Sequence, residues 1–195
     1  MADSDRDKWN ARYRERGENA STPSPAIVEL AEFLPPVTPA RCDHRALDVA
    51  GGSGRHAIWL AERGFRVTVV DVAKEGLALA ARAATARGIE LETVIRDLDT
   101  EPLPDGPFDV ILCHHFLYPS LFDESASRLA PNGVVVAVHP TQRNLERHPR
   151  PSARFLFEEG ALRRAADGWE ILHADEGWQS TGRHEARVVA RPRSE

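Results

Sequence analysis

The chain has 195 residues, of which 42% are hydrophobic, and a formal net charge of -5. This size supports one domain over residues 1–195, and the acidic balance argues against general nucleic-acid binding or a membrane surface, because either partner normally selects a dominant basic face. No apolar run reaches the roughly 18 residues that span a bilayer, and the polar first residues are not a secretory signal, so the sequence predicts a cytoplasmic protein.

Residues 1–44 predict an N-terminal arm followed by a helix, which together cover the site. The charged arm carries Trp9 and Tyr13 at helical spacing. Pro25 is suited to the first turn of the second helix, and Pro35 ends it.

Residues 45–140 alternate between strand-like and helix-like patterns and are predicted to form the cofactor-binding core. Strands are expected over residues 46–49, 66–71, 91–96, 109–113 and 134–139, with helices over 55–63, 74–87 and 123–129. Gly64 and Gly88 lie where helix C-caps belong. Such alternation predicts a doubly wound, Rossmann-like α/β fold: a mainly parallel sheet with helices on both faces.

The C-terminal part interrupts this alternation. A short helix is expected over residues 158–166, followed by the strand-like runs "WEILHADE" (169–176) and "HEARVVAR" (184–191). We expect these two runs to complete the sheet as an antiparallel pair. The two cysteines, Cys42 and Cys113, fall on different predicted elements, which indicates ordinary thiols and neither a disulfide nor a cysteine-bound zinc ion.

A glycine cluster follows the first strand, in the stretch "ALDVAGGSGRHAIWL" (46–60). It formally fits the G-x-G-x-x-G/A dinucleotide fingerprint. Three predicted strands also end in carboxylates, Asp48, Asp71 and Asp97. Any one of them alone is as well explained as a solvated or helix-capping residue. Three at the same edge of a parallel sheet predict a ligand site there.

The carboxylates help to distinguish between two cofactor classes. Asp71 has the spacing of an acid that binds a ribose diol, which nicotinamide and adenosyl cofactors share. Asp48 precedes the loop, where its charge would repel a pyrophosphate but attract the ammonium of S-adenosylmethionine. The residues therefore favour S-adenosylmethionine, with an NAD(P)-dependent oxidoreductase as the alternative.

The run "LDVAGGSGRHAIWLAERGFRVTVVDVA" resembles the first motif and second strand of class I S-adenosylmethionine-dependent methyltransferases. The resemblance implies that the loop approaches the methionine moiety, the acid after strand two binds the ribose, the acid after strand three meets the adenine amine, and residues after strand four face the reactive centre. The predicted cofactor-binding set is Asp48, Ala50, Gly51, Gly52, Gly54, Arg55, Asp71, Val72, Asp97, Leu98, Cys113 and His114.

Two loop positions depart from the family pattern. Ala50 stands where glycine is usual, and Gly51 where a cysteine or another small residue is common. A positive φ at Ala50 would strain the turn.

Within this superfamily the chain most resembles the tellurite-resistance (TehB-like) methyltransferases, through "GSGRHAIWLAERG" and "FLFEEGALRRAADGWEILHADE". This resemblance implies a small-molecule acceptor, often a soft nucleophile. A non-catalytic S-adenosylmethionine-binding protein remains a further alternative.

The predicted catalytic residues are His114, Tyr118, Arg143 and Arg154. Residues 141–157 concentrate arginines and form a candidate acceptor lid, with a solvated surface as the alternative. His115 and His139 are interpreted as filling or capping strand ends, and no metal site is predicted from these histidines. Because no carboxylate–histidine pair is legible, the sequence favours a soft or anionic acceptor such as tellurite, selenite or a thiol.

Overall fold

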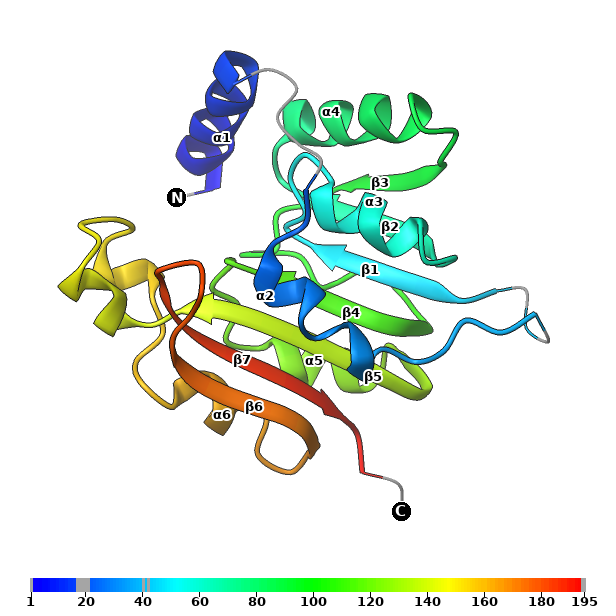
Figure 1. The fold of residues 1–195 in the computed structure, drawn as a ribbon. Helices are drawn as coiled ribbons and strands as arrows, with labels where there is room; N and C mark the ends of the chain where they lie inside the picture. Colours follow the sequence, from blue (N-terminus) through cyan, green and yellow to red (C-terminus); the bar gives the residue numbers. More distant parts are fainter. Residues whose placement is uncertain (1, 17–21, 40, 42, 194–195) are drawn as a thin grey trace. The chain divides into compact units, whose positions relative to one another are not determined.

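The structure, a computed structural model, describes residues 2–16, 22–39, 41 and 43–193 (Figure 1). Cys42, predicted to be an ordinary thiol, lies outside the described residues. The chain divides into two compact units, Met1–Pro23 with Pro36–Phe108, and Ser24–Pro35 with Asp109–Glu195. Within the described residues, no helix has the length and apolar character needed to cross a membrane.

The first unit holds three parallel strands in the order β3-β2-β1. They are β1 (Arg45–Val49), β2 (Arg66–Asp71) and β3 (Leu91–Ile95). Val49 pairs with Val70, and Asp71 pairs with Ile95. The carboxyl ends of the three strands therefore meet at one edge, as the sequence predicts.

Two helices of the first unit lie on the same side of these strands (Figure 1). They are α3 (Arg55–Ala61), which packs on β1 and β2, and α4 (Lys74–Thr85), which packs on β2 and β3. The N-terminal helix α1 (Ala2–Arg16) contacts α4. It follows that the first unit stacks α1 on α4 and α4 on the strands.

The second unit holds four strands in the order β4-β5-β7-β6. They are β4 (Phe108–His114), β5 (Leu129–Pro140), β6 (Glu170–Trp178) and β7 (His184–Arg191). β7 runs antiparallel to both β5 and β6, which confirms the predicted C-terminal antiparallel pair. β5 begins at Leu129 rather than at the predicted residue 134, because the Pro131–Gly133 turn signal lies within the strand, with Asn132 at a φ of 64°.

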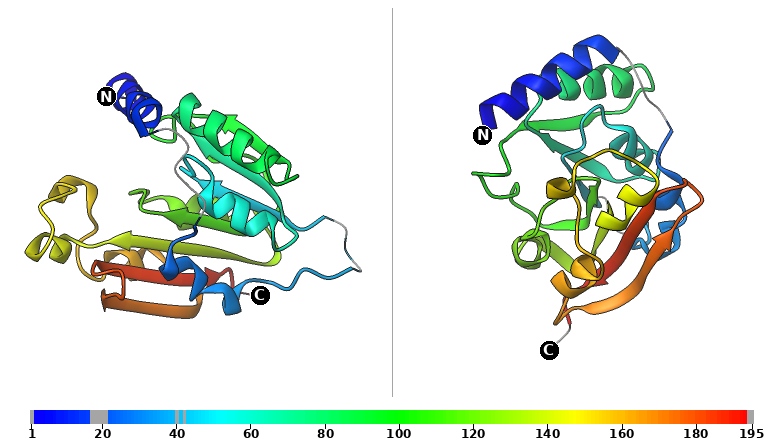
Figure 2. Two further views of the ribbon diagram at one scale, coloured as in Figure 1. Left: turned by 45° about the horizontal axis from the view of Figure 1, so that its top comes forward. Right: turned by 90° about the vertical axis from the view of Figure 1, so that its left-hand side faces the viewer.

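Helices cover both faces of the second unit's strands. In Figures 1 and 2, α2 lies on one face, while α5 and α6 lie on the other. Their bounds are α2 (Pro25–Val28), α5 (Leu121–Ala126) and α6 (Ala161–Ala165), and three short 3₁₀ helices complete the unit, η1 (Ala31–Phe33), η2 (Gln142–Glu146) and η3 (Ala153–Phe155).

The helix predicted to run from Pro25 to Pro35 is divided between α2 and η1. The N–H of Leu30 donates to the carbonyl of Ile27 at 3.1 Å, which is the tighter 3₁₀ spacing. This spacing brings Ile27, Leu30 and Phe33 into line. Ile27 and Leu30 are buried, and the Phe33 ring lies 5.2 Å from that of His173 on β6.

Candidate functional site

The loop after β1 adopts the left-handed backbone that the glycine cluster permits. Ala50 has a φ of 51°, and Gly52 has a φ of 56°. The strain expected at Ala50 is therefore present, because a Cβ in this region costs about 1–2 kcal/mol relative to glycine. Such strain persists where the surrounding structure holds the turn in place.

Asp48 occupies the inside of this loop and is 1% exposed. A Cβ at Gly51 would lie 2.6 Å from its Oδ2 atom, so glycine at position 51 makes room for the carboxyl group. Oδ2 also accepts the N–H of Ala57 at 3.1 Å, in the first turn of α3. Burial raises the pKa of Asp48 to about 7, against the lowering effects of the Ala57 hydrogen bond and the charge of Arg55.

This geometry changes the argument against a dinucleotide. A carboxyl group with a pKa near 7 is only partly ionised at neutral pH, so the expected repulsion of a pyrophosphate is weaker than the sequence suggested. The hydrogen bond supplies a stronger reason. A pyrophosphate at a helix N-terminus uses the free N–H groups of the first turn, and Asp48 already takes that of Ala57.

Asp71, the last residue of β2, holds the loop from the other side. Its Oδ2 accepts the N–H of Gly52 at 2.8 Å, and its Oδ1 accepts the N–H of Ala73 at 2.8 Å. Burial raises the pKa of Asp71, although these backbone hydrogen bonds oppose the shift. One carboxylate therefore connects the glycine loop to the start of α4.

The third predicted carboxylate lies just beyond β3. Oδ1 of Asp97 accepts the N–H of Asp99 at 3.1 Å, and the backbone N–H of Asp97 donates to Glu101 at 3.0 Å. Leu98 beside it is 8% exposed. Asp48, Asp71 and Asp97 therefore all lie at the carboxyl edge of the first unit's strands.

Tyr13 of α1 also lies against the loop, a contact that sequence reasoning did not assign. A Cβ at Gly52 would lie 2.1 Å from the Tyr13 hydroxyl oxygen, and one at Gly76 would lie 2.8 Å from Tyr13 Cε2. Asn10 accepts the N–H of Glu75 at 3.0 Å, which supplies α4 with a cap from another helix. The available signal was the W-x-x-x-Y spacing of Trp9 and Tyr13.

In the second unit, the predicted residues Cys113 and His114 end β4. Cys113 is buried, and its Sγ lies 3.5 Å from the carbonyl oxygen of Phe116. The His114 ring stacks on that of His115 at a centroid distance of 3.7 Å. His115 itself has a φ of 58°, a left-handed conformation that is uncommon for histidine.

His115 is paired with a carboxylate, which the sequence did not reveal. Its Nε2 lies 2.6 Å from Oε1 of Glu185, at the start of β7. Glu185 is opposite Pro140 in the β5–β7 register, so the end of β5 and the start of β7 place it beside the end of β4. The strand-end interpretation of His115 did not include this partner.

His139 agrees with the strand-end interpretation. Its Nδ1 lies 2.8 Å from the carbonyl oxygen of Pro140, and its ring lies 5.1 Å from that of Phe157. Burial lowers the pKa of His139 to about 4, so its imidazole is neutral at physiological pH.

Tyr118 and the two predicted arginines have local partners in the second unit. The Tyr118 hydroxyl donates to Glu124, and its pKa is raised chiefly by burial, so it stays protonated at neutral pH. Arg143 lies 3.0 Å from Glu146, and its guanidinium lies 4.0 Å from Glu159. Arg154 lies over the Phe155 ring at 4.5 Å.

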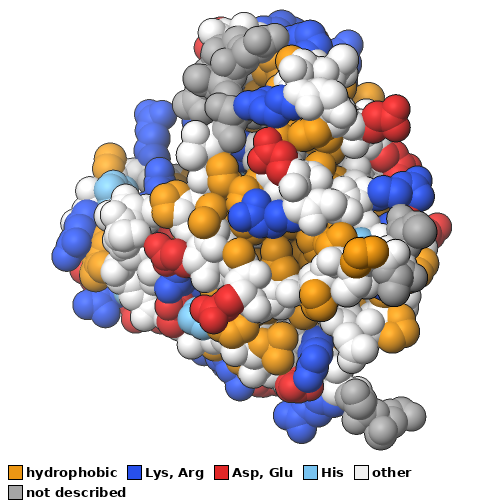
Figure 3. Space-filling view, turned by 45° about the vertical axis from the view of Figure 1, so that its right-hand side comes forward, with side chains coloured by type: hydrophobic (Ala, Val, Ile, Leu, Met, Phe, Trp, Pro, Cys, Tyr) orange, Lys and Arg blue, Asp and Glu red, His pale blue; other side chains and the backbone are white. Residues whose placement is uncertain are grey.

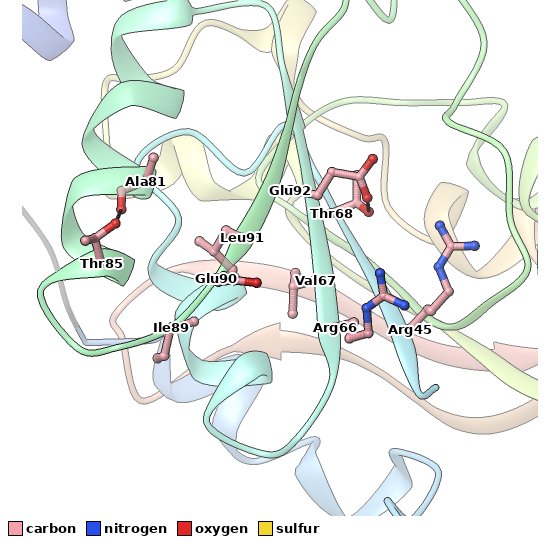
Figure 4. Close-up of a pocket in the computed structure, with 10 residues that line it drawn as sticks. All are labelled: Arg45, Arg66, Val67, Thr68, Ala81, Thr85, Ile89, Glu90, Leu91 and Glu92. Atoms are coloured by element: carbon pink, nitrogen blue, oxygen red, sulfur yellow. Dashed lines mark hydrogen bonds between the residues drawn. The ribbon is translucent and has the colours of Figure 1, made fainter. Parts of the chain in front are cut away.

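A pocket of about 420 Å³ lies at the opposite edge of the first unit's strands (Figure 4). Arg45 and Arg66 line it and are the first residues of β1 and β2, whereas the glycine loop follows the last residue of β1. Thr68 and Glu92 close one side through a 2.8 Å hydrogen bond. This pocket is therefore separate from the loop and its carboxylates.

No group of three or more His, Cys, Asp or Glu side chains is arranged to hold a metal ion within the described part of the chain.

Residues 46–133 match the family described as a methyltransferase domain. The chain is 36% identical over 118 residues to a demethylmenaquinone methyltransferase of Thermus thermophilus. The aligned region covers 57% of this chain and 50% of that protein. It is 28% identical over 128 residues to a tRNA 5-carboxymethoxyuridine methyltransferase of Escherichia coli, which covers 60% of this chain and 48% of that protein. The chain spans about half the length of these curated relatives.

Solved structures extend the likeness beyond these residues. TehB from Haemophilus influenzae matches with a TM-score of 0.70 and 20% identity, over 94% of this chain and 67% of that one. An S-adenosylmethionine-dependent methyltransferase from Mesorhizobium loti matches with a TM-score of 0.63 and 22% identity, over 84% of this chain and 96% of that one. Residues 46–133 are thus similar to a methyltransferase domain. The chain has the Rossmann-like fold of these solved structures, which confirms the fold prediction.

Proposed function

We propose that the protein transfers a methyl group from S-adenosylmethionine to a small-molecule acceptor. The observation that carries this proposal is the carboxyl edge of the first unit, where Asp71 holds the glycine loop through the Gly52 N–H at 2.8 Å. This edge is where open α/β sheets bind their ligands. The methyltransferase-domain match over residues 46–133 supports the same assignment.

The residues present suit this cofactor. A Cβ at Gly51 would collide with Asp48, so the loop keeps a buried carboxyl group directly beneath its backbone. That group is suited to the ammonium of the methionine moiety, because a neighbouring cation favours the ionised form of a buried acid. Asp71 would accept hydrogen bonds from the ribose, and Asp97 with Leu98 would meet the adenine.

When bound, the cofactor supplies a methyl group already activated by a sulfonium, so the protein contributes mainly by alignment. The residues after β4, Cys113 and His114, are proposed to face the reacting methyl group.

A small molecule is favoured over a nucleic acid by charge. The chain has a net charge of -5, and on the face shown in Figure 3 the basic and acidic side chains are interspersed. Nucleic-acid binding normally requires a continuous basic patch, because the phosphate contacts supply most of the affinity.

The acceptor hypothesis from the sequence named tellurite, selenite or a thiol. It rested on arginines near the edge and on the lack of a paired base. Likeness to TehB favours it, whereas the His115–Glu185 pair removes the second premise. Arg143 and Arg154 stay proposed acceptor contacts for an anionic substrate, in competition with the contact between Arg143 and Glu146.

Calorimetry with S-adenosylmethionine, S-adenosylhomocysteine and NADH tests the cofactor assignment. We expect micromolar binding of both adenosyl ligands and no response to NADH. Assays with labelled methyl donor on oxyanions, thiols, carboxylates, phenols and amines then test catalysis. Binding of NADH alone would refute the proposal, and adenosyl binding without turnover of any acceptor would indicate a non-catalytic binding protein.

A further inference from the structure

We propose that His115 is the general base that deprotonates the methyl acceptor, that Glu185 positions it, and that the acceptor group is a phenolic hydroxyl. This inference rests on the methyltransferase activity proposed above and deepens it. It arises from a pair of side chains 70 residues apart, joined at 2.6 Å within the second unit.

The hydrogen bond assigns the two ring nitrogens of His115. We assign Glu185 as the ionised acceptor of this contact, and because an ionised carboxylate only accepts, the imidazole proton is then on Nε2. The lone pair is on Nδ1, the nitrogen that would receive the proton of the acceptor group. The titratable groups that face this ring are Glu185, the stacked His114 at 3.7 Å and His139 at 6.4 Å.

His115 is more exposed than Glu185, as expected when His115 reaches the substrate and Glu185 positions it from the protein interior. The His115 side chain is 29% exposed, whereas that of Glu185 is 1% exposed. Oε2 of Glu185 has no hydrogen-bond partner among the described residues. Protonation of the neighbouring imidazole stabilises a buried carboxylate that has so few hydrogen-bond partners, because the positive charge offsets the free-energy cost of burying the negative one.

The same pair argues for the acceptor class. A tellurite oxyanion or a thiolate attacks without losing a proton, so a positioned base has no role for it. A phenol keeps its proton at neutral pH, since its ordinary pKa is about 10, and it gains from a base. The rings beside His115, namely His114 at 3.7 Å and His139 at 6.4 Å, suit a planar acceptor.

The hydroxyl proton moves to Nδ1 of His115 while the acceptor oxygen bonds to the methyl carbon. The carbon–sulfur bond breaks, its electron pair stays on sulfur, and the positive charge is transferred to the imidazolium beside Glu185. The imidazolium then releases the proton to water through its exposed side.

The test compares His115→Gln and Glu185→Gln with His173→Gln as a matched control. His173 is 26% exposed and lies 3.5 Å from a carboxylate of Asp175, so the control alters a similar pair on β6. With phenolic acceptors, His115→Gln should lower kcat/KM by about 10²–10⁴-fold. The control should stay within about twofold of the unaltered protein.

The pH profile separates a chemical role from a structural one. Turnover should fall at low pH, because a general base acts only in its unprotonated form, and His115→Gln should abolish that limb. Glu185→Gln should keep the limb but lower kcat/KM, because the imidazolium loses its carboxylate partner. Imidazole added to His115→Ala should restore part of the rate, since a soluble base can reach a partly exposed position.

A readout without turnover is the ¹⁵N NMR spectrum of His115 in the unliganded protein, which should report the Nε2–H tautomer. The inference is overturned by an Nδ1–H tautomer, by full phenol turnover in His115→Gln, or by methylation confined to thiols, tellurite and selenite. In the last case the proposed function stands. Failure of the unaltered protein to bind the methyl donor by calorimetry would instead overturn the proposed function.

Discussion

The backbone N–H of Gly52 donates to Oδ2 of Asp71 at 2.8 Å, so the end of β2 holds the loop that follows β1. Asp71→Ala should therefore weaken the proposed S-adenosylmethionine binding in two ways, by removing the proposed ribose acceptor and by releasing the loop. Charge-assisted hydrogen bonds are worth about 1.5–3 kcal/mol, which corresponds to a roughly tenfold to hundredfold rise in Kd. Calorimetry measures this rise.

Asp99→Ala is the control for that variant, since Asp99 is an exposed acid in the loop after β3. Its Kd should match that of the unaltered protein. An unchanged Kd in Asp71→Ala would place the ribose elsewhere.

The buried Asp48 should make the protein less stable at alkaline pH. Below about pH 3, both the folded and the unfolded states are largely protonated at this group. Between pH 4 and 7 only the unfolded state ionises, because burial raises the folded-state pKa to about 7. The unfolding free energy should therefore fall as pH rises through this window and level off above it, with about 2–3 kcal/mol lost between pH 5 and 8.

Asp48→Asn should remove this contribution while keeping an oxygen that can accept the Ala57 N–H. Urea unfolding of both proteins at pH 5 and 8 provides the measurement. The change in unfolding free energy between the two pH values, compared between the two proteins, gives the contribution of Asp48. Identical pH dependence in the two proteins would show that Asp48 ionises in the folded state as easily as in water.

Gly52 and Gly88 offer a matched pair of substitutions. Both have a positive φ, 56° and 70°, but a Cβ at Gly52 would lie 2.1 Å from the Tyr13 hydroxyl, whereas one at Gly88 would meet nothing within 4 Å. Gly88→Ala should cost only the backbone strain, about 1–2 kcal/mol. Gly52→Ala should cost more, and it should also weaken cofactor binding.

Tyr13→Ala removes the side chain with which a Cβ at Gly52 would collide. In that background, the two glycine substitutions should lower the thermal midpoint by similar amounts. A Gly52→Ala protein no less stable than Gly88→Ala would mean that Tyr13 does not lie over the loop in solution.

Arg143→Ala and Arg154→Ala distinguish the two acceptor classes. For a phenolic acceptor we expect kcat/KM within about twofold of the unaltered value, because Arg143 is 46% exposed and already lies beside two carboxylates. For an anionic acceptor held by either guanidinium, KM should rise by roughly one to two orders of magnitude. Steady-state kinetics with a phenol and with tellurite decides between these outcomes.

The sequence predicted several strands well because they are short runs, mostly apolar, between turn residues. β2 (Arg66–Asp71) and β7 (His184–Arg191) have the predicted bounds, and the positive φ of Gly64 and Gly88 agrees with their predicted place at helix ends. Helix bounds were less accurate. α3 ends at Ala61 and not at residue 63, because its last turn tightens so that Arg63 bonds the carbonyl of Leu60.

The site was predictable only where it follows strand ends. Asp48 and Asp71 lie at one edge as predicted because parallel strands bring their carboxyl ends together, and their role toward a cofactor stays a prediction. Glu185 was not predicted, since its approach to His115 depends on the register of β7 against β5, which no local pattern specifies. Its one visible signal was a charged residue at the start of an otherwise apolar strand.

Glu185, the proposed positioning residue, lies outside the part of the chain that matches the methyltransferase family, whereas the proposed donor site lies inside it. The family match ends at residue 133, before β7 and the arginine-bearing segment begin. The glycine loop and its carboxylates therefore lie in the shared part, whereas the partner of His115 comes from a hairpin outside it. Under the proposed function, relatives that differ only in this hairpin should bind the same methyl donor and methylate different molecules, so substrate choice could diverge while the proposed donor site stays unchanged.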